Sequence, residues 1–459
     1  MNLTDANLDI LRTAMQTLTA GFDGLPPSTA HLHTDQSADI LSRAARRLHN
    51  NYPYHHPLYV GQMLKPPHPI AQLAYALAMN LNPNNHALDG GRESSQMEKE
   101  AVAAIAQMFG WTDFMGHLCG GGTMANFEAL WVSRELNQSS GKMAVLASSQ
   151  SHYTHSRLSQ VLQMPYRSVE VDKIGNMDMA ALERELEKGD VGLVVATLGS
   201  TLAGTVDPLP DILALRERYG FRLHVDTAYG GYFMLTANLD PAVRMAYDAI
   251  RDADSVVVDP HKHGLQPYGC GCVLFKDPSV GRIYQHDSPY TYFSSEELHL
   301  GEITLECSRA GASAVALWCT HEAFPLTPEG EFAASLTQCR QAAMTFYQWL
   351  HDSARFTPLF GPQLDIVCWA VDAPSASEAS KRANQVFDQA AKHDLHLAVA
   401  SVPKSMCSAL QCIDDWDQDS VSVLRACVMK PEHLDYLDVI TRRLDKATVE
   451  VLENDLPGT

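Results

Sequence analysis

Between residues 115 and 275 the chain alternates largely apolar runs of four to seven residues with longer segments in which apolar residues recur every three or four positions. Short continuous apolar runs are typical of buried strands, and the longer periodic segments are typical of amphipathic helices. Strands that alternate with helices indicate a mostly parallel sheet with helices on its faces. The strands predicted in this way are 144–147, 191–197, 223–226, 255–258 and 270–275.

The pattern changes after about residue 328, where long helical patterns separate only two apolar runs, which predicts a small α+β domain. The helices predicted there are 331–350, 377–393 and 434–452, and the strands are 365–371 and 421–428. We therefore expect three parts: an N-terminal helical segment or dimer arm (1–93), a large α/β cofactor-binding domain (94–328) and a C-terminal small α+β domain (329–459).

Residues 94–109 carry a further helical pattern at the start of the large domain. Ser95 is followed three positions later by Glu98, the spacing of a capping box, in which each side chain bonds the backbone of the other residue. This spacing predicts that a helix starts at Ser95 and packs its apolar face against the core.

Composition and net charge argue against several classes of function. The 459-residue chain has a formal net charge of −20 at pH 7, which argues against binding to nucleic acid or to an anionic membrane surface. Its ten cysteines show no paired CxxC spacing, and the adjacent His55 and His56 lack a third ligand at suitable spacing, so we expect reduced thiols and no metal. The N-terminus lacks the basic and apolar regions of a secretory signal, and no window approaches a membrane span. We expect a soluble, cytoplasmic protein.

The strongest chemical signal is Lys262, which follows the predicted strand 255–258. Asp259-Pro260 ends that strand because proline cannot continue a ladder. Lys262 then lies in a loop at the strand's C-terminal end, where open α/β sheets bind their ligands. A lysine amine with a lowered pKa can attack an aldehyde, although a loop lysine taken alone is more often simply solvated.

Asp226 strengthens this interpretation because it ends the preceding predicted strand at the same edge of the sheet. A carboxylate that faces a pyridinium nitrogen keeps that nitrogen protonated, which makes pyridoxal phosphate an electron sink. Asp226 by itself could equally cap a helix. An amine and a carboxylate on successive strand ends are harder to explain as structure alone.

The segments HVDTAYGG (224–231) and SVVVDPHKHG (255–264) resemble the group II pyridoxal-phosphate-dependent amino-acid decarboxylases, which include aromatic-amino-acid, glutamate and bacterial tyrosine decarboxylases. The resemblance runs from about Pro57 to the C-terminus and implies a fold-type I transferase-like fold. It implies that Lys262 carries pyridoxal 5'-phosphate, that Asp226 pairs with the pyridine nitrogen, that Ala228 lies under the ring, and that His261 contacts the cofactor.

Further cofactor contacts follow from the same resemblance. Glycines let backbone N–H groups approach an anion, and the run Cys119–Asn126 precedes a helical pattern, although such a run taken alone is weak evidence for a phosphate site. Gly122 and Thr123 match the Gly-Ser of the family's phosphate-binding motif, so the resemblance implies that they bind the phosphate. The family's stacking histidine matches His152 rather than the nearby His155. Thr197 would lie near the ring substituents, and Ser308 and Arg309 would contact the phosphate or the dimer seam.

Other residues are implied to act on the substrate. A loop tyrosine would protonate the carbanion, and Tyr290 and Tyr292 are both candidates, although an interface loop with packing aromatic residues is an equal alternative. Tyr59 and Gln62 are candidate substrate contacts. Arg425 would bind the substrate carboxylate, with a structural salt bridge as the alternative.

The resemblance implies decarboxylation of an L-amino acid to the amine and carbon dioxide by a homodimer with active sites at the subunit interface. The same groups also support transamination or oxidative deamination, and a silent, cofactor-binding interaction protein is a third possibility. The combination of Lys262, Asp226 and His152 argues against the silent form. The sequence does not determine which amino acid is the substrate.

Overall fold

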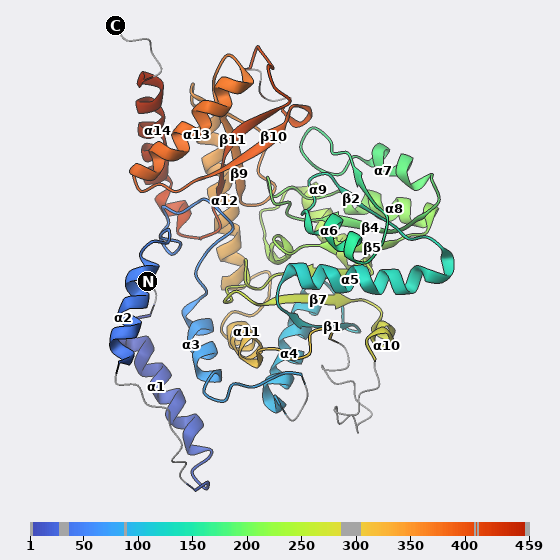
Figure 1. The fold of residues 1–459 in the computed structure, drawn as a ribbon, viewed down its shortest axis with the longest axis vertical. Coiled ribbons are helices and arrows are strands. Elements are labelled where there is room, and N and C mark those ends of the chain that lie inside the picture. Colours follow the sequence, from blue (N-terminus) through green and yellow to red (C-terminus); the bar gives the residue numbers. More distant parts are fainter. Residues whose placement is uncertain are drawn as a thin grey trace.

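The computed structural model describes residues 3–26, 36–86, 90–285, 304–407, 410 and 413–454. A seven-stranded sheet with the order β1-β7-β6-β5-β4-β2-β3 forms the large domain (Figure 1). Strands β3, β2, β4, β5 and β6 are parallel, whereas β7 runs antiparallel to its neighbours β6 and β1. The strand bounds are β1 Met115–Cys119, β2 Ala144–Ser148, β3 Tyr166–Val169, β4 Val191–Thr197, β5 Arg222–Asp226, β6 Ser255–Val258 and β7 Gly271–Phe275.

Helices cover both faces of this sheet, which is why β4 and β6 are buried along their whole length. Successive strand residues point to opposite faces and therefore belong to different apolar clusters. One face packs against α5 (Gly122–Asn137) and α6 (Thr154–Val161). The other face packs against α4 (Arg92–Met108), α7 (Met179–Leu186), α8 (Leu209–Tyr219) and α9 (Pro241–Asp248).

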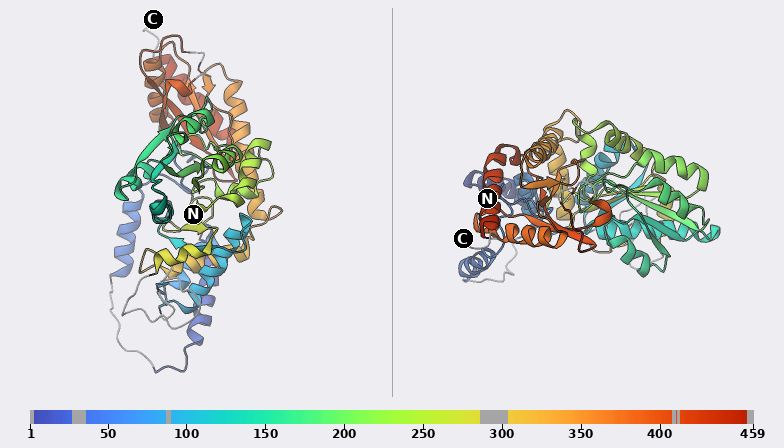
Figure 2. Two further views of the ribbon diagram at one scale, coloured as in Figure 1. Left: turned by 90° about the vertical axis from the view of Figure 1, so that its right-hand side faces the viewer. Right: turned by 90° about the horizontal axis from the view of Figure 1, so that it is seen from above.

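The C-terminal part forms a second, antiparallel sheet with the order β10-β11-β9-β8, at the top of the molecule in Figure 1 and in Figure 2 (left). Trp369 of β9 is fully buried there, with its ring 5.2 Å from that of Phe346. Val60 joins this sheet, because its N–H donates to His396 and its carbonyl accepts from Cys427. The bounds are α12 Glu331–His351, β8 Phe356–Pro358, β9 Ile366–Val371, α13 Ala376–Lys392, β10 Ala398–Pro403, β11 Ser420–Cys427 and α14 His433–Asn454.

The remaining α-helices lie beside and below the seven-stranded sheet in Figure 1. They are α1 Asp5–Ala20, α2 Ser37–Leu48, α3 Pro69–Ala78, α10 Gly281–Tyr284 and α11 Gly311–Ala323. Neither α1 nor α2 buries a residue, so their apolar side chains are accessible in the single chain. None of the described helices is long and apolar enough to cross a membrane.

The predicted α/β class, with a mostly parallel sheet and a small C-terminal α+β unit, is confirmed. The division at residues 93 and 328 stays a prediction, and the pairing of Val60 with β11 links the first predicted part to the last.

The predicted capping box of α4 is wrong. The helix starts at Arg92, three residues before Ser95, and Gly91 is its N-cap. Glu98 instead points into the protein, where its carboxylate accepts hydrogen bonds from Asn85 at 2.6 Å and from the backbone of Leu118 at 3.0 Å. Arg309 forms an ion pair with the same carboxylate at 2.5 Å. Arg309, expected at the phosphate or the dimer seam, thus ties α4 to the segment before α11.

We expect Glu98→Gln to destabilise the fold strongly, because it leaves the buried Arg309 guanidinium without its counter-charge. Breaking a buried ion pair costs about 3–5 kcal/mol. Urea unfolding measures this loss, with Glu93→Gln in the exposed first turn of the same helix as the matched control. Equal unfolding midpoints for the two variants would contradict this interpretation of the buried pair.

Candidate active site

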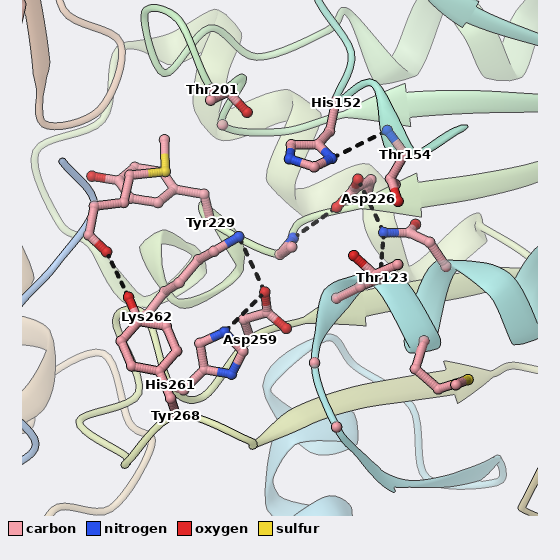
Figure 3. A pocket seen from close by; sticks show the side chains of 18 of the residues that line it. Thr123, His152, Thr154, Thr201, Asp226, Tyr229, Asp259, His261, Lys262 and Tyr268 are labelled. Carbon is pink, nitrogen blue, oxygen red and sulfur yellow. Dashed lines mark hydrogen bonds and ion pairs between the residues drawn. The ribbon is translucent and has the colours of Figure 1, made fainter. Parts of the chain in front are cut away.

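A cavity of about 620 Å³ opens at the C-terminal ends of β4, β5 and β6 (Figure 3). Parallel strands bring these ends together, since Thr197 pairs with Asp226 and Asp226 pairs with Val257. Of the predicted cofactor-binding residues, eight line this cavity: Gly122, Thr123, His152, Thr197, Asp226, Ala228, His261 and Lys262.

Asp226 is the buried carboxylate of the cavity, with 5% of its surface exposed. His155 donates to Oδ2 at 2.9 Å, Asn126 donates to the same oxygen at 3.3 Å, and the backbone N–H of Ala228 donates to Oδ1 at 3.0 Å. Burial alone would raise the pKa of Asp226, but the interaction with His155 and the hydrogen bond from Ala228 outweigh it and hold that pKa far below its usual range. Asp226 is therefore a fixed negative charge.

A second layer of polar groups orients the donors to Asp226. His224 of β5 donates from Nε2 to the Asn126 carbonyl oxygen at 2.8 Å and accepts at Nδ1 from Ser255 at 2.8 Å. Burial lowers the pKa of His224 to about 3, so this ring is neutral. With its oxygen engaged by His224, the Asn126 amide presents its N–H groups to Asp226 and to the carbonyl of Gly122.

Lys262 reaches the cavity from the loop after β6, and 23% of its side chain is exposed. Its Nζ lies 3.1 Å from Oδ2 of Asp259, and Nε2 of His261 lies 3.5 Å from the same oxygen. The other oxygen, Oδ1 of Asp259, is buried without a hydrogen-bond partner. Asp259 thus holds the lysine amine at the cavity wall.

The glycine-rich turn before α5 forms another part of the cavity wall. Gly121 has φ +147°, a conformation that favours glycine, and a Cβ on Gly122 would approach Asp259 Oδ2 to 2.8 Å. The turn leads into the first turn of the 16-residue α5, whose backbone N–H groups and dipole favour an anion. The Gly120 N–H is already engaged, since it donates to Glu306 at 2.8 Å.

The two histidines that compete in the sequence take different places. His155 is fully buried beneath the cavity and bonds Asp226. His152 faces the cavity, and its Nδ1 accepts from the backbone of Thr154 at 3.3 Å (Figure 3). Burial lowers the pKa of His152, with the charge of Asp226 opposing that shift, so the imidazole is neutral at pH 7.

The predicted substrate residues lie further out. Gln62 and Arg425 line a neighbouring cavity of about 400 Å³ that shares His152, Tyr153 and Thr201 with the first. Arg425 donates to the carbonyls of Leu202 and Thr201 and to the Gln62 side chain. No carboxylate of the described residues lies within ion-pair distance of Arg425, so the predicted structural salt bridge is absent from that part of the chain.

Two other candidates in the described part of the chain, Tyr59 and Ser308, line neither cavity. Tyr59 is buried, and its hydroxyl accepts from the Gln62 backbone at 3.2 Å. Ser308 is exposed on the single chain, where it accepts from Asn84 at 3.1 Å. Tyr290 and Tyr292 lie outside the described residues.

Sequence reasoning missed Asn126 and Asp259 as site residues and treated His155 only as a competitor of His152. A partial signal existed, because Asp259 directly follows β6 and Asn126 lies in the quoted glycine-rich segment. Tyr268, whose ring lies 4.8 Å from that of His261, belongs to no recognisable motif, and only the folded loop brings it to the cavity.

The conserved domain described as the pyridoxal-dependent decarboxylase domain matches residues 24–372. The chain belongs to the pyridoxal-dependent decarboxylase family. It is a pyridoxal-phosphate-dependent amino-acid decarboxylase, so the resemblance, the cofactor and the reaction class expected from the sequence are confirmed.

Named relatives of this decarboxylase act on different amino acids. An L-tyrosine decarboxylase of Enterococcus faecium is 28% identical over 78% of this chain and 77% of its own length. An aspartate 1-decarboxylase of Aliivibrio fischeri is 24% identical over 75% of this chain and 68% of its own length. The structure of mouse CSAD matches with a TM-score of 0.78, 19% identity and coverage of 97% and 99% of the two chains. Oryza sativa TDC with PLP and tryptamine matches with a TM-score of 0.78, 16% identity and coverage of 98% and 99%.

The residues of this decarboxylase's cavity fit pyridoxal phosphate. A carboxylate offers about four acceptor positions, and three donors reach Asp226, which leaves room for a pyridine N–H. The Thr197 hydroxyl is buried at the cavity without a partner, as expected for a group that awaits a ligand. The turn at Gly121 and Gly122 leaves space for a phosphate, and Lys262 supplies the amine.

We expect His155→Phe to weaken cofactor binding by about 10- to 100-fold, since hydrogen bonds to charged groups contribute about 1.5–3 kcal/mol. Without its main donor the pKa of Asp226 rises, and the carboxylate no longer holds its charge firmly. Fluorescence titration of the apoenzyme with pyridoxal phosphate measures the affinity. His351→Phe is the control, because that side chain is 65% exposed. Unchanged affinity in His155→Phe would contradict the role of this donor.

A second buried carboxylate, Asp207, positions Thr197. It accepts from the backbone N–H of Thr197 and of Met177, each at 2.7 Å. Burial outweighs these hydrogen bonds and raises the pKa of Asp207 to about 6, from an ordinary 3.8. The folded state therefore binds a proton more tightly than the unfolded state between these pH values, and stability falls as pH rises through this window.

We expect Asp207→Asn to remove this slope. Relative to the native protein, the variant should gain about 2 kcal/mol of unfolding free energy between pH 4 and pH 7, on top of a constant cost for the lost acceptor. Urea unfolding at both pH values measures the change, with Asp211→Asn in the exposed first turn of α8 as control. A constant difference between Asp207→Asn and the native protein would refute the raised pKa.

Proposed function

We propose that this decarboxylase converts an L-amino acid to its amine in the cavity described above, with Lys262, Asp226 and His152 in the central roles. Bound pyridoxal phosphate supplies an electron-withdrawing ring that stabilises the charge left on Cα as carbon dioxide departs. Lys262 would carry the cofactor and yield it to the substrate amine. Asp226, with its lowered pKa, would hold the pyridine nitrogen in its protonated form.

The observation that carries this proposal is the shared cavity of Lys262 and Asp226. Asp226 is the last residue of β5, Lys262 follows the neighbouring parallel strand β6, and both line the same space. Asp226 is charged and accepts hydrogen bonds from His155, Asn126 and the Ala228 backbone. Lys262 is only partly exposed and is held by Asp259. An amine and a fixed carboxylate on one cavity suit a cofactor with an aldehyde and a basic ring nitrogen.

The surrounding residues take supporting roles in this proposal. His152, a neutral imidazole facing the cavity, would stack on the ring and accept or return a proton. Tyr290 or Tyr292 would donate the proton to Cα. The further proposed cofactor contacts are Gly122, Thr123, Thr197, Ala228, His261 and Ser308.

The neighbouring cavity would receive the rest of the substrate. Arg425 is buried, and its described hydrogen bonds go to neutral oxygens, so its positive charge favours a carboxylate ligand. Gln62 would orient Arg425 through its side-chain oxygen, and the Tyr59 hydroxyl would hold the backbone of Gln62. L-tyrosine and L-aspartate, on which the named relatives act, are the first substrates to test.

We also propose a homodimer in the cytoplasm. The apolar residues Leu8, Ile10, Ile40 and Leu41 on α1 and α2 are each at least 43% exposed, and a second subunit would cover them. All nine cysteines in the described part of the chain are free, which suits a reducing compartment. Light scattering on the purified protein tests the dimer, and a monomeric mass would refute it.

We expect Lys262→Arg to lower carbon dioxide release by at least about a hundredfold, because arginine keeps the charge but cannot bond the cofactor aldehyde. Release from a panel of L-amino acids measures the effect, with Lys276→Arg, 48% exposed, as control. Keto acid or hydrogen peroxide as the main product would instead indicate transamination or oxidative deamination. A cofactor spectrum without any turnover would indicate the silent alternative.

A further inference from the structure

A buried carboxylate of the small domain reaches the loop that carries Lys262. Asp365 lies immediately before β9 and has no exposed surface. Its backbone carbonyl accepts from Val428, which follows β11, so the residue is fastened to the small sheet. Its side chain points the other way, toward the large domain.

The first partner of Asp365 is Tyr229, a residue of the cavity wall. The Tyr229 hydroxyl donates to Oδ1 of Asp365 at 2.7 Å. Tyr229 stands three positions after Asp226, in the turn that follows β5. Both groups are buried, so neither can replace this hydrogen bond with one to water.

The second partner is His263, the residue after Lys262. Its Nε2 lies 3.2 Å from Oδ2 of Asp365, and both groups are fully buried. The imidazole is also enclosed by the rings of Tyr229 and Phe233, at 4.8 and 5.0 Å in edge-on contact. Neither ring nitrogen has a hydrogen bond of good alignment, so the charge of Asp365 is the main polar interaction that His263 has.

We propose that Asp365 is a positioning residue that clamps Tyr229 and His263 together and so holds Lys262 at the cofactor cavity from the small domain. Asp365 touches neither the cavity nor Lys262. It acts through one residue on each of the two segments that carry the proposed reactive groups. The inference rests on the proposed role of Lys262 and adds the means by which the small domain controls it.

A buried carboxylate at this position costs free energy of hydration, and a residue that only joins two domains would not need that charge. A buried charge loses its hydration, and apolar side chains of similar volume usually stabilise a domain junction as well or better. A charge that engages both loops restricts the positions of their backbones, and misplacement of a reactive group by about 1 Å can lower a rate by about 100-fold. The clamp is therefore expected to affect the placement of Lys262 more than stability.

The test compares Asp365→Ala with Asp365→Asn and with Asp372→Ala, a carboxylate near the other end of β9 that accepts from Thr357 at 2.7 Å. Uptake of pyridoxal phosphate by each apoenzyme is followed by absorbance, and borohydride trapping on Lys262 is followed by mass spectrometry. We expect Asp365→Ala to slow trapping and to lower kcat by about 10- to 100-fold, with little change in KM. Asp365→Asn, which can still accept from Tyr229, should recover part of both.

Trapping and kcat that match those of Asp372→Ala would overturn the proposal, even if Asp365→Ala unfolds at lower urea. If Asp365→Ala does not fold, His263→Leu takes its place, since that side chain lies outside the cavity, and a normal trapping rate there overturns the clamp. Failure of the proposed function is distinguishable, because Lys262→Arg would then still release carbon dioxide. An inactive Lys262→Arg together with a normal Asp365→Ala refutes the clamp alone.

Discussion

The structure of this decarboxylase depends on one buried negative charge. Asp226 lies at the end of β5, away from water, and keeps its charge because His155, Asn126 and the Ala228 backbone all donate to it. These donors come from α6, α5 and the turn after β5, so the charge requires that three separate elements meet. His224 and Ser255 extend the same arrangement into the sheet. A charged Asp226 therefore requires the same packing of helices on the sheet that the fold itself requires.

Much of this arrangement could be predicted from the sequence, because local patterns carry it. Continuous apolar runs identify β4 and β6, and the polar residues that end β5 and β6 identify Asp226 and Lys262. Strand ends of a parallel sheet meet at one edge, so the order of motifs along the chain already implies their proximity in space.

The parts that sequence reasoning missed depend on contacts between distant segments. The Ser95 and Glu98 spacing suits a helix start, but the carboxylate finds Arg309 more than 200 positions away, and burial of that pair determines its orientation. His155 comes three positions after His152, and only the packing of α6 decides which ring meets Asp226. The antiparallel direction of β7 likewise follows from its connection and not from its composition.

The close approach of two backbones near the glycine-rich turn has a consequence for how this protein can change over evolutionary time. A Cβ on Gly271, at the start of β7, would lie 2.5 Å from the Cα of Gly121. Neither glycine bears a reactive group, yet any side chain at position 271 must displace the backbone beside the cavity. Position 271 can therefore take no residue but glycine without a shift of the turn, so this site restricts sequence change even where no chemistry takes place.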